Sequence, residues 1–193
     1  TPLNDSFSRM GVVFAGFGGQ GIMMLGQMLS LLGMRHGLAV TWLPSYGPEM
    51  RGGTANCSVV LSMDPIGSPV VDSPALLVAM NGPSLEKFLP KVAPGGLLVY
   101  NSSIIEQKPE RQDIDIIGVP AADMARTAGS ERAANVVMLG VIAGWYGSFG
   151  DTALTSVLEE FFPKKDLLLL NNKALEAGMV FGAQARADQK GMP

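Results

Sequence analysis

The chain has 193 residues, of which 47% are hydrophobic and 16% charged, and it carries a net charge of −3. This length and composition fit one globular domain with a full hydrophobic core. A slightly acidic chain offers no basic field to nucleic acid or anionic lipid, so neither is expected as a partner. The single cysteine, Cys57, excludes an internal disulfide and a cysteine cage for a metal or cluster, and no metal site is expected.

No apolar run approaches the roughly 20 residues that span a bilayer, and the N-terminal residues lack the features of a signal peptide. We therefore expect no membrane association and a cytoplasmic location. Low charge with 24 glycines and 12 methionines suggests a surface that another chain covers, with a homodimer as one option for the isolated chain. One domain over residues 10–187 is expected between flexible tails at 1–9 and 188–193.

Short apolar runs alternate with helical patterns, which predicts an α/β fold. We expect a Rossmann-like, mostly parallel sheet with flanking helices and a helical C-terminal portion that shares its core. Strands are expected at Met10–Ala15, Ala39–Leu43, Asn56–Ser62, Leu76–Met80, Gly96–Tyr100 and Asp115–Val119. Helices are expected at Ile22–Met34, Ser84–Val92, Glu131–Tyr146, Ala153–Phe162 and Leu168–Ala187.

The run Gly16-Phe17-Gly18-Gly19-Gln20-Gly21 fits the pattern G-x-G-x-x-G between the first predicted strand and helix. Glycines allow a close backbone approach, and the free N–H groups at a helix start favour a phosphate. The alternative is a tight turn in which Gly21 lets helix and sheet pack closely. A conventional NAD site also needs an acid at the end of the second strand, where this chain has Leu43-Pro44-Ser45. We therefore expect an anion site without NAD.

A second unusual stretch, residues 45–53, follows the second predicted strand at the same sheet edge. Arg51 has donors suited to phosphate or carboxylate, and Glu49 is placed to orient it or to substitute for the missing acid. The alternative is a local Glu–Arg surface pair. Asn81 and Asn101 each follow a predicted strand at that edge, although asparagine also suits turns there. Glu49 and Arg51 are therefore candidates for cofactor binding, with Asn81 and Asn101 as supporting candidates.

Three runs together carry a family resemblance: Gly16 to Gly21, Ser45 to Cys57, and Gly96-Leu97-Leu98-Val99-Tyr100-Asn101-Ser102-Ser103. Their order and spacing over residues 10–182 resemble the γ subunit of 2-oxoacid:ferredoxin oxidoreductases. The run from Tyr46 to Cys57 is more similar to the 2-oxoglutarate and branched-chain oxoacid members than to the pyruvate members. The resemblance ranks 2-oxoglutarate first as substrate, then branched-chain 2-oxoacids or pyruvate.

That resemblance implies a multi-subunit enzyme that decarboxylates a 2-oxoacid oxidatively on thiamine diphosphate with magnesium. Electrons would pass through [4Fe–4S] clusters to ferredoxin, and the acyl group would go to coenzyme A. It implies thiamine-binding α and β subunits and an iron–sulfur, ferredoxin-like subunit as partners. This chain would pack on the catalytic subunits and help to hold coenzyme A, with the coenzyme's phosphates at Gly16 to Gly21 and Arg51.

The chain itself is expected to contain no catalytic residue. Thiamine diphosphate sites need Gly-Asp-Gly and a downstream Asn-Asn, and Gly150-Asp151-Thr152 with Asn171-Asn172 fails that motif in its third glycine and its spacing. His36, at the end of the first predicted helix, fits a structural role. Cys57 lies in an apolar strand and is expected to pack as a small hydrophobe.

Two alternatives stay open. A stand-alone oxidoreductase or regulatory module would use the glycine turn with NAD, FAD or an acyl-CoA, but only Glu49 and Asp72 are plausible carboxylates near the edge, and neither has an evident partner. A purely structural subunit would use the same glycines only for close packing of helix on strand.

Overall fold

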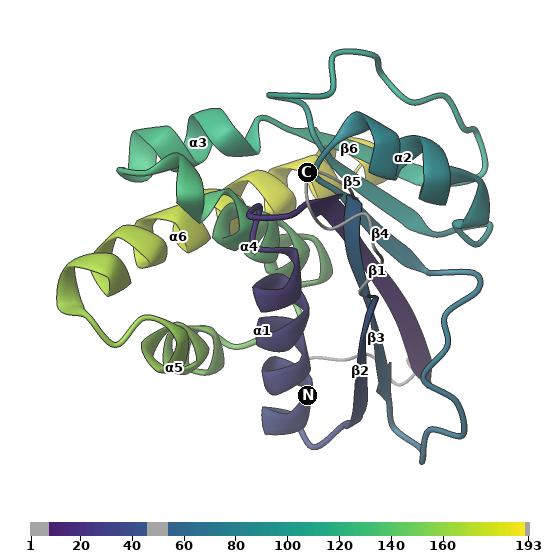
Figure 1. Ribbon diagram of the computed structural model, residues 1–193, viewed down its shortest axis with the longest axis horizontal. Coiled ribbons are helices and arrows are strands. Elements are labelled where there is room, and N and C mark those ends of the chain that lie inside the picture. The colour runs from purple at the N-terminus through teal and green to yellow at the C-terminus, as the bar shows by residue number, and fades with distance from the viewer. Residues whose placement is uncertain (1–7, 46–53, 192–193) are drawn as a thin grey trace. The chain divides into compact units, whose positions relative to one another are not determined.

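The computed structural model describes residues 8–45 and 54–191, and Figure 1 shows its ribbon. The chain divides into two compact units, one formed by the residues up to Pro120 and the other by those from Ala121 onward. The first unit holds the sheet, and the second is helical. The prediction of one domain with a shared core stays a prediction.

One mixed sheet of six strands forms the first unit, in the order β2-β3-β1-β4-β5-β6. β1 pairs antiparallel with β3, and β3 antiparallel with β2, whereas the pairs β1–β4, β4–β5 and β5–β6 are parallel. All strands except β3 therefore point the same way, as the predicted mostly parallel sheet requires. The strands are β1 (Arg9–Phe17), β2 (Ala39–Ser45), β3 (Thr54–Ser62), β4 (Leu76–Ala79), β5 (Leu97–Asn101) and β6 (Asp115–Val119).

The centre of the sheet, where β1 and β4 each pair with a strand on both sides, is apolar. All four residues of β4 are buried, and so are the β1 residues from Val12 to Ala15. Such continuous apolar runs are typical of strands covered on both faces. The covering helices are α1 (Ile22–Arg35), against β1, β2 and β3, and α2 (Gly82–Phe88), against β1 and β4. Figure 1 shows them on opposite faces of the sheet.

A compact apolar cluster lies under α2, which continues into the short 3-10 helix η2 (Leu89–Lys91). Leu85 and Phe88 of α2 pack there on alternate residues of three strands, such as Val13, Leu77 and Leu98. The expected helix Ser84–Val92 is therefore present, but it starts two residues earlier. The earlier start follows from Asn81, whose side-chain Oδ1 accepts a hydrogen bond from the N–H of Ser84 at 2.9 Å.

The helical unit is built around two helices in backbone contact, α4 and α6. Glycines on both helices allow this close approach: Gly140 and Gly144 on α4, Gly178 and Gly182 on α6. α4 is buried along nearly its whole circumference, from Ala134 to Ala143. The elements are α3 (Ala121–Ala128), η3 (Glu131–Ala133), α4 (Ala134–Tyr146), α5 (Asp151–Phe161) and α6 (Lys165–Lys190).

The boundaries differ from the sequence expectations at both ends of the chain. β1 already begins at Arg9, because Arg9 pairs with Ser62 of β3. α6 runs to Lys190, into the segment expected as a flexible tail, and ends at Gly191 in a left-handed conformation. Within the described part of the chain, none of the helices has the length and apolarity that crossing a membrane requires.

Candidate functional site at the carboxyl edge of the sheet

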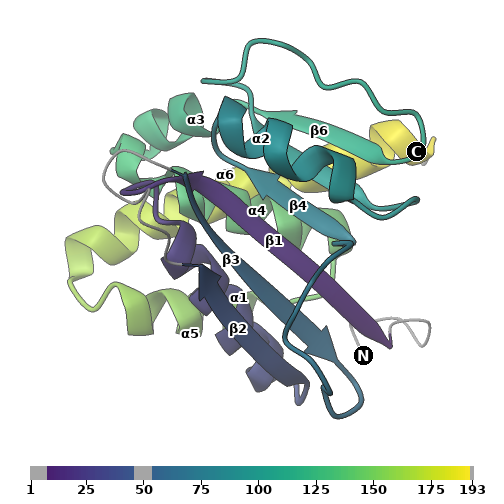
Figure 2. The ribbon, with the colours of Figure 1, turned by 45° about the vertical axis from the view of Figure 1, so that its right-hand side comes forward.

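The sheet brings most of the sequence-predicted site residues to one edge, at the carboxyl ends of the parallel strands. Figure 2 shows the strand directions that define this edge. The glycine turn follows β1, Asn81 comes two residues after β4, and Asn101 is the last residue of β5. Ser45 and Thr54, the described neighbours of residues 46–53, pair into the same edge, since Thr54 lies opposite Phe17. β1 and β4 are adjacent, and their following helices cover opposite faces, which is the position where open α/β sheets bind ligands.

Three glycines of the turn are required for steric reasons. Gly19 and Gly21 have φ angles of +89° and +73°, a left-handed conformation that favours glycine. A Cβ atom on Gly16 would lie 2.8 Å from Cδ1 of Ile22 and 2.9 Å from Cβ of Met80. The turn therefore needs glycine at these positions whether or not a ligand is bound. Beside Gly19, by contrast, a Cβ atom would meet no atom of the described residues within 4 Å, so none of these residues fills the tip of the turn.

Gln20 ties the turn to the neighbouring strand end. Its Oε1 accepts a hydrogen bond from the N–H of Phe17 at 2.6 Å, and its Nε2 donates to the carbonyl of Met80 at 3.2 Å. The backbone N–H of Gln20 donates in turn to the carbonyl of Phe17 at 3.2 Å. The side chain of Gln20 thus bridges the ends of β1 and β4. Gln20 was predicted as a cofactor-binding residue.

The first helix presents its start to the same edge. Gly21 caps α1 without a side-chain hydrogen bond, and the first turn contains no acidic residue. The first N–H groups of a helix lack acceptors within the helix, and the helix dipole adds partial positive charge there. This end of α1 is therefore electrostatically suited to an anion. It is one of the two features on which the predicted phosphate site depends.

The other feature is the segment that carries Glu49 and Arg51. Both residues lie outside the described residues, so the predicted orientation of Arg51 by Glu49 stays a prediction. Ser45 and Thr54 show only that the chain leaves and re-enters the described structure at the edge of the glycine turn.

The two predicted asparagines have local structural partners. Asn81 is 0% exposed and caps α2, while its Nδ2 has no hydrogen-bond partner in the described structure. Asn101 is 1% exposed, and its Oδ1 accepts from the N–H of Ser103 at 3.2 Å. Both side chains thus stabilise the turns at the strand ends, as the alternative interpretation of the sequence held. Contact of either with a ligand stays a prediction.

Comparison with known proteins decides the family. Residues 11–181 match the family model described as pyruvate ferredoxin/flavodoxin oxidoreductase. The chain belongs to this family. The resemblance found in the sequence is therefore confirmed at the level of the family.

The relatives of this chain in the oxidoreductase family fall into two groups that differ in length. Ketoisovalerate oxidoreductase subunit VorA of Methanothermobacter thermautotrophicus is 41% identical over 92% of the chain, but the chain spans only 37% of that protein's length. 2-Oxoglutarate synthase subunit KorC of Methanothermobacter marburgensis is 31% identical over 80% of the chain and 87% of the relative.

Solved structures share the fold of this family member. A keto/oxoacid ferredoxin oxidoreductase γ subunit from Geobacter sulfurreducens has a TM-score of 0.79 at 23% identity, over 91% of this chain and 99% of the other. The 2-oxoglutarate:ferredoxin oxidoreductase from Magnetococcus marinus has a TM-score of 0.84 at 24% identity, over 93% of this chain and 32% of the other. At these identities the likeness shows the fold alone, and it confirms the predicted α/β architecture.

Sequence analysis missed a cavity of about 480 Å³ beside α2 of this oxidoreductase family member. Leu85 and Leu89 line one side, and Ile104 and Ile105, a few residues after β5, line another. Its charged lining residues are Glu86, Glu106, Lys108 and Glu110. Three carboxylates against one ammonium make this cavity unfavourable for a phosphate, so the glycine turn remains the better anion site at this edge. The sequence signal was weak, because this lining comes from segments about 20 residues apart.

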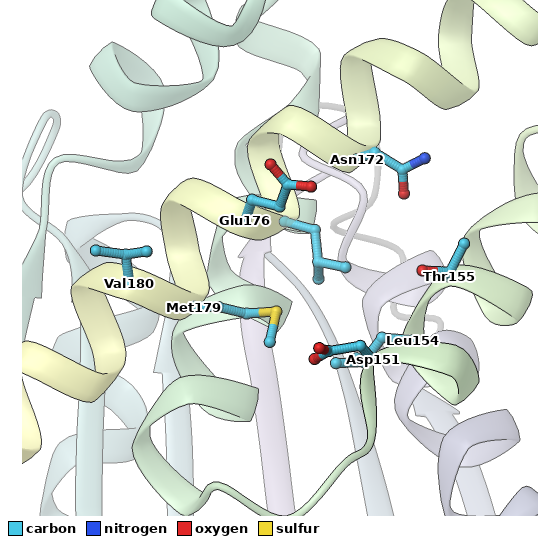
Figure 3. Close-up of a pocket in the computed structure, with 8 residues that line it drawn as sticks. Asp151, Leu154, Thr155, Asn172, Glu176, Met179 and Val180 are labelled. Atoms are coloured by element: carbon cyan, nitrogen blue, oxygen red, sulfur yellow. The ribbon is translucent and has the colours of Figure 1, made fainter.

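A second cavity, of about 370 Å³, lies between α5 and α6 (Figure 3) and contains part of the failed thiamine motif. Asp151 and Asn172 both line it, but Asn171 does not: its Nδ2 donates to the carbonyl of Leu167 at 2.8 Å. The other lining includes Glu176 and apolar residues such as Leu175 and Met179. Two acidic residues without a lining cation would repel a diphosphate, so the arrangement agrees with the sequence-based rejection.

Cys57 and His36 both have local contacts in the first unit. Cys57 is fully buried, and burial raises the pKa of its thiol to about 11. Its Sγ donates to the carbonyl oxygen of Ile22 at 3.5 Å. Nδ1 of His36 lies 2.8 Å from the carbonyl oxygen of Leu32 at the end of α1. Within residues 8–45 and 54–191, no three His, Cys, Asp or Glu side chains are grouped to hold a metal ion.

Proposed function

We propose that this chain is the γ-type component of a 2-oxoacid:ferredoxin oxidoreductase that acylates coenzyme A. The observation that carries the proposal is the family match over residues 11–181. The relative KorC also supports the γ-type assignment, because it is 31% identical over 80% of this chain and 87% of that protein. Thiamine diphosphate, magnesium and [4Fe–4S] clusters would then belong to partner α, β and ferredoxin-like subunits, with ferredoxin as electron acceptor.

For the substrate, we rank branched-chain 2-oxoacids ahead of 2-oxoglutarate, the reverse of the order that the sequence motifs suggested. The support is the greater identity to a relative named for ketoisovalerate, 41% against 31% for one named for 2-oxoglutarate. The lower value is still substantial, so both substrates belong in the first assay.

For this chain's own role, we propose that the glycine turn and the start of α1 bind a phosphate of coenzyme A. Three features support the site: a helix start without a side-chain cap, a first helical turn without acidic residues and a space beside Gly19 that no described residue fills. The Magnetococcus protein of the same fold has coenzyme A bound. In this proposal Arg51 supplies the matching positive charge, and Gln20 holds the turn in place.

A purely structural turn is the second candidate, and one observation favours it. Gly16, Gly19 and Gly21 are already explained by close packing or positive φ angles without any ligand. The two candidates differ in whether changes at this edge alter the use of coenzyme A or only the stability of the subunit.

The experiment that tests the function is anaerobic affinity purification of this chain from its native cell. The co-purified material would be assayed for coenzyme A-dependent oxidation of branched-chain 2-oxoacids, 2-oxoglutarate and pyruvate, with viologen as acceptor. Recovery of thiamine-binding and iron–sulfur subunits with this activity is the expected result. A chain that emerges alone and binds NAD would contradict the proposal and support a stand-alone nucleotide-binding module.

A further inference from the structure

One side of α6 has an unusual pattern of four exposed residues. Leu169 and Val180 are 53% and 73% exposed, and between them lie the exposed Lys173 and Glu176. Their spacing of four, three and four residues places all four on one side of the helix. Figure 3 shows Glu176 and Val180 projecting on the same side of α6, and both also line the cavity between α5 and α6 together with Met179. We call these four residues the α6 stripe.

The two charged residues of the α6 stripe have no polar partner within the described part of the chain. Neither Lys173 nor Glu176 takes part in a hydrogen bond or ion pair there. An exposed Val and an exposed Leu with opposite charges between them form a surface that one partner of matching pattern would cover. The order along the helix is apolar, positive, negative, apolar.

Two copies of this order match when they run in opposite directions, because each apolar residue then faces an apolar residue and each charge faces the opposite charge. Leu169 and Val180 are equally far in sequence from the midpoint between Lys173 and Glu176. If a second α6 lies antiparallel across a two-fold axis at this midpoint, Leu169 of each copy packs on Val180 of the other. The same axis brings each Lys173 opposite the other copy's Glu176. A spacing of four and three residues is that of helices packed side by side.

The next residues outward on this face do not oppose the arrangement. The same axis places the small, exposed Ala183 opposite Asp166 of the other copy, so no like charges meet and no bulky side chains collide. A two-fold contact uses the same patch on both copies, so each favourable pair occurs twice.

We propose that the α6 stripe is a contact between two copies of this chain, packed as an antiparallel helix pair. A second copy fits better than an unrelated partner because one symmetry axis satisfies both the apolar and the charged pairs. The proposal does not depend on the proposed function.

The test is the oligomeric state of the full chain, measured by sedimentation equilibrium up to about 1 mM. We expect a reversible dimer. In the Glu176→Lys variant, Lys173 of each copy would face the new lysine of the other copy. We expect this repulsion to weaken dimerisation at least about tenfold. The double variant Lys173→Glu, Glu176→Lys exchanges the charges and restores the pairs, so it should dimerise like the wild type.

The matched control is Glu159→Lys, the same charge change at an exposed position of α5 outside the α6 stripe. It should leave dimerisation unchanged, and far-UV circular dichroism would show that all variants keep their helices. A wild-type chain that stays monomeric up to about 1 mM overturns the proposal. So does a dimer that Glu176→Lys does not weaken, or a loss that the double variant does not restore.

Discussion

Gly140 on α4 and Gly178 on α6 meet backbone to backbone: a Cβ atom on either would lie 3.0 Å from the other's Cα. A Cβ on Gly178 would also overlap the carbonyl oxygen of Val137, and one on Gly140 would overlap that of Leu175. One turn further along, a Cβ on Gly144 would overlap the carbonyl oxygen of Met179, and one on Gly182 that of Val141. The helical unit is therefore held by a contact that only glycine permits.

We expect Gly178→Ala to lower the free energy of unfolding by about 1–3 kcal/mol, because the added methyl group meets backbone atoms that cannot rotate away. On an open helix the same change would stabilise the chain by about 1 kcal/mol, so the sign of the effect is diagnostic. Urea unfolding followed by circular dichroism measures it. The control is Gly67→Ala, where a Cβ would meet nothing within 4 Å. A stabilised Gly178→Ala variant would show that the two helices are not in backbone contact.

Gln20→Ala should destabilise the sheet edge, because it removes the hydrogen bonds to Phe17 and Met80 that join β1 to β4. We expect a loss of about 1–2 kcal/mol and faster hydrogen exchange at the Phe17 amide. Gln27→Ala, at an exposed position of α1, is the matched control and should change stability by less than about 0.5 kcal/mol. Unchanged exchange at Phe17 would mean that Gln20 does not hold the turn.

These two relationships show what the sequence could and could not predict. Apolar runs bounded by glycine and proline located all six strands, and the glycine motif was placed correctly between strand and helix. The reversed direction of β3 and the extension of β1 through Phe17 depend on pairing between residues far apart in sequence, such as Thr54 with Phe17 and Ser62 with Arg9. The hydrogen bond from Gln20 to Met80 could not be predicted either, because it joins residues 60 positions apart and periodicity describes only local structure.

Cys57 should be inert toward thiol reagents in the folded chain. With a pKa raised to about 11 by burial, about one thiol in a thousand is ionised at pH 8, and its sulfur is inaccessible. A disulfide reagent added to native protein at pH 8 should give no reaction, and the same reagent in urea should titrate one thiol. Rapid modification of native protein would mean that the strand opens or that the thiol is exposed.

The raised pKa of Cys57 also predicts a loss of stability in alkali. The folded-state pKa of about 11 exceeds the ordinary value of 9.0, so the unfolded chain releases the thiol proton first. The stabilisation is complete below pH 9 and is lost as the pH rises toward 11, up to about 2–3 kcal/mol. Urea unfolding of the wild type and of Cys57→Ala from pH 8 to 11 measures the difference. Parallel pH curves would contradict this prediction.

Arg51→Ala in the assembled enzyme separates the phosphate-binding role of the sheet edge from a purely structural one. We expect the apparent KM for coenzyme A to rise by about 5- to 150-fold, which corresponds to the loss of a charged hydrogen bond on the order of 1–3 kcal/mol. The KM for the 2-oxoacid should stay the same, because that substrate would bind in partner subunits. Arg132→Ala, at an exposed arginine of the helical unit, is the matched control. If Arg51→Ala leaves the KM for coenzyme A unchanged while subunits still co-purify, Arg51 does not bind the coenzyme, and the structural interpretation of the turn gains support.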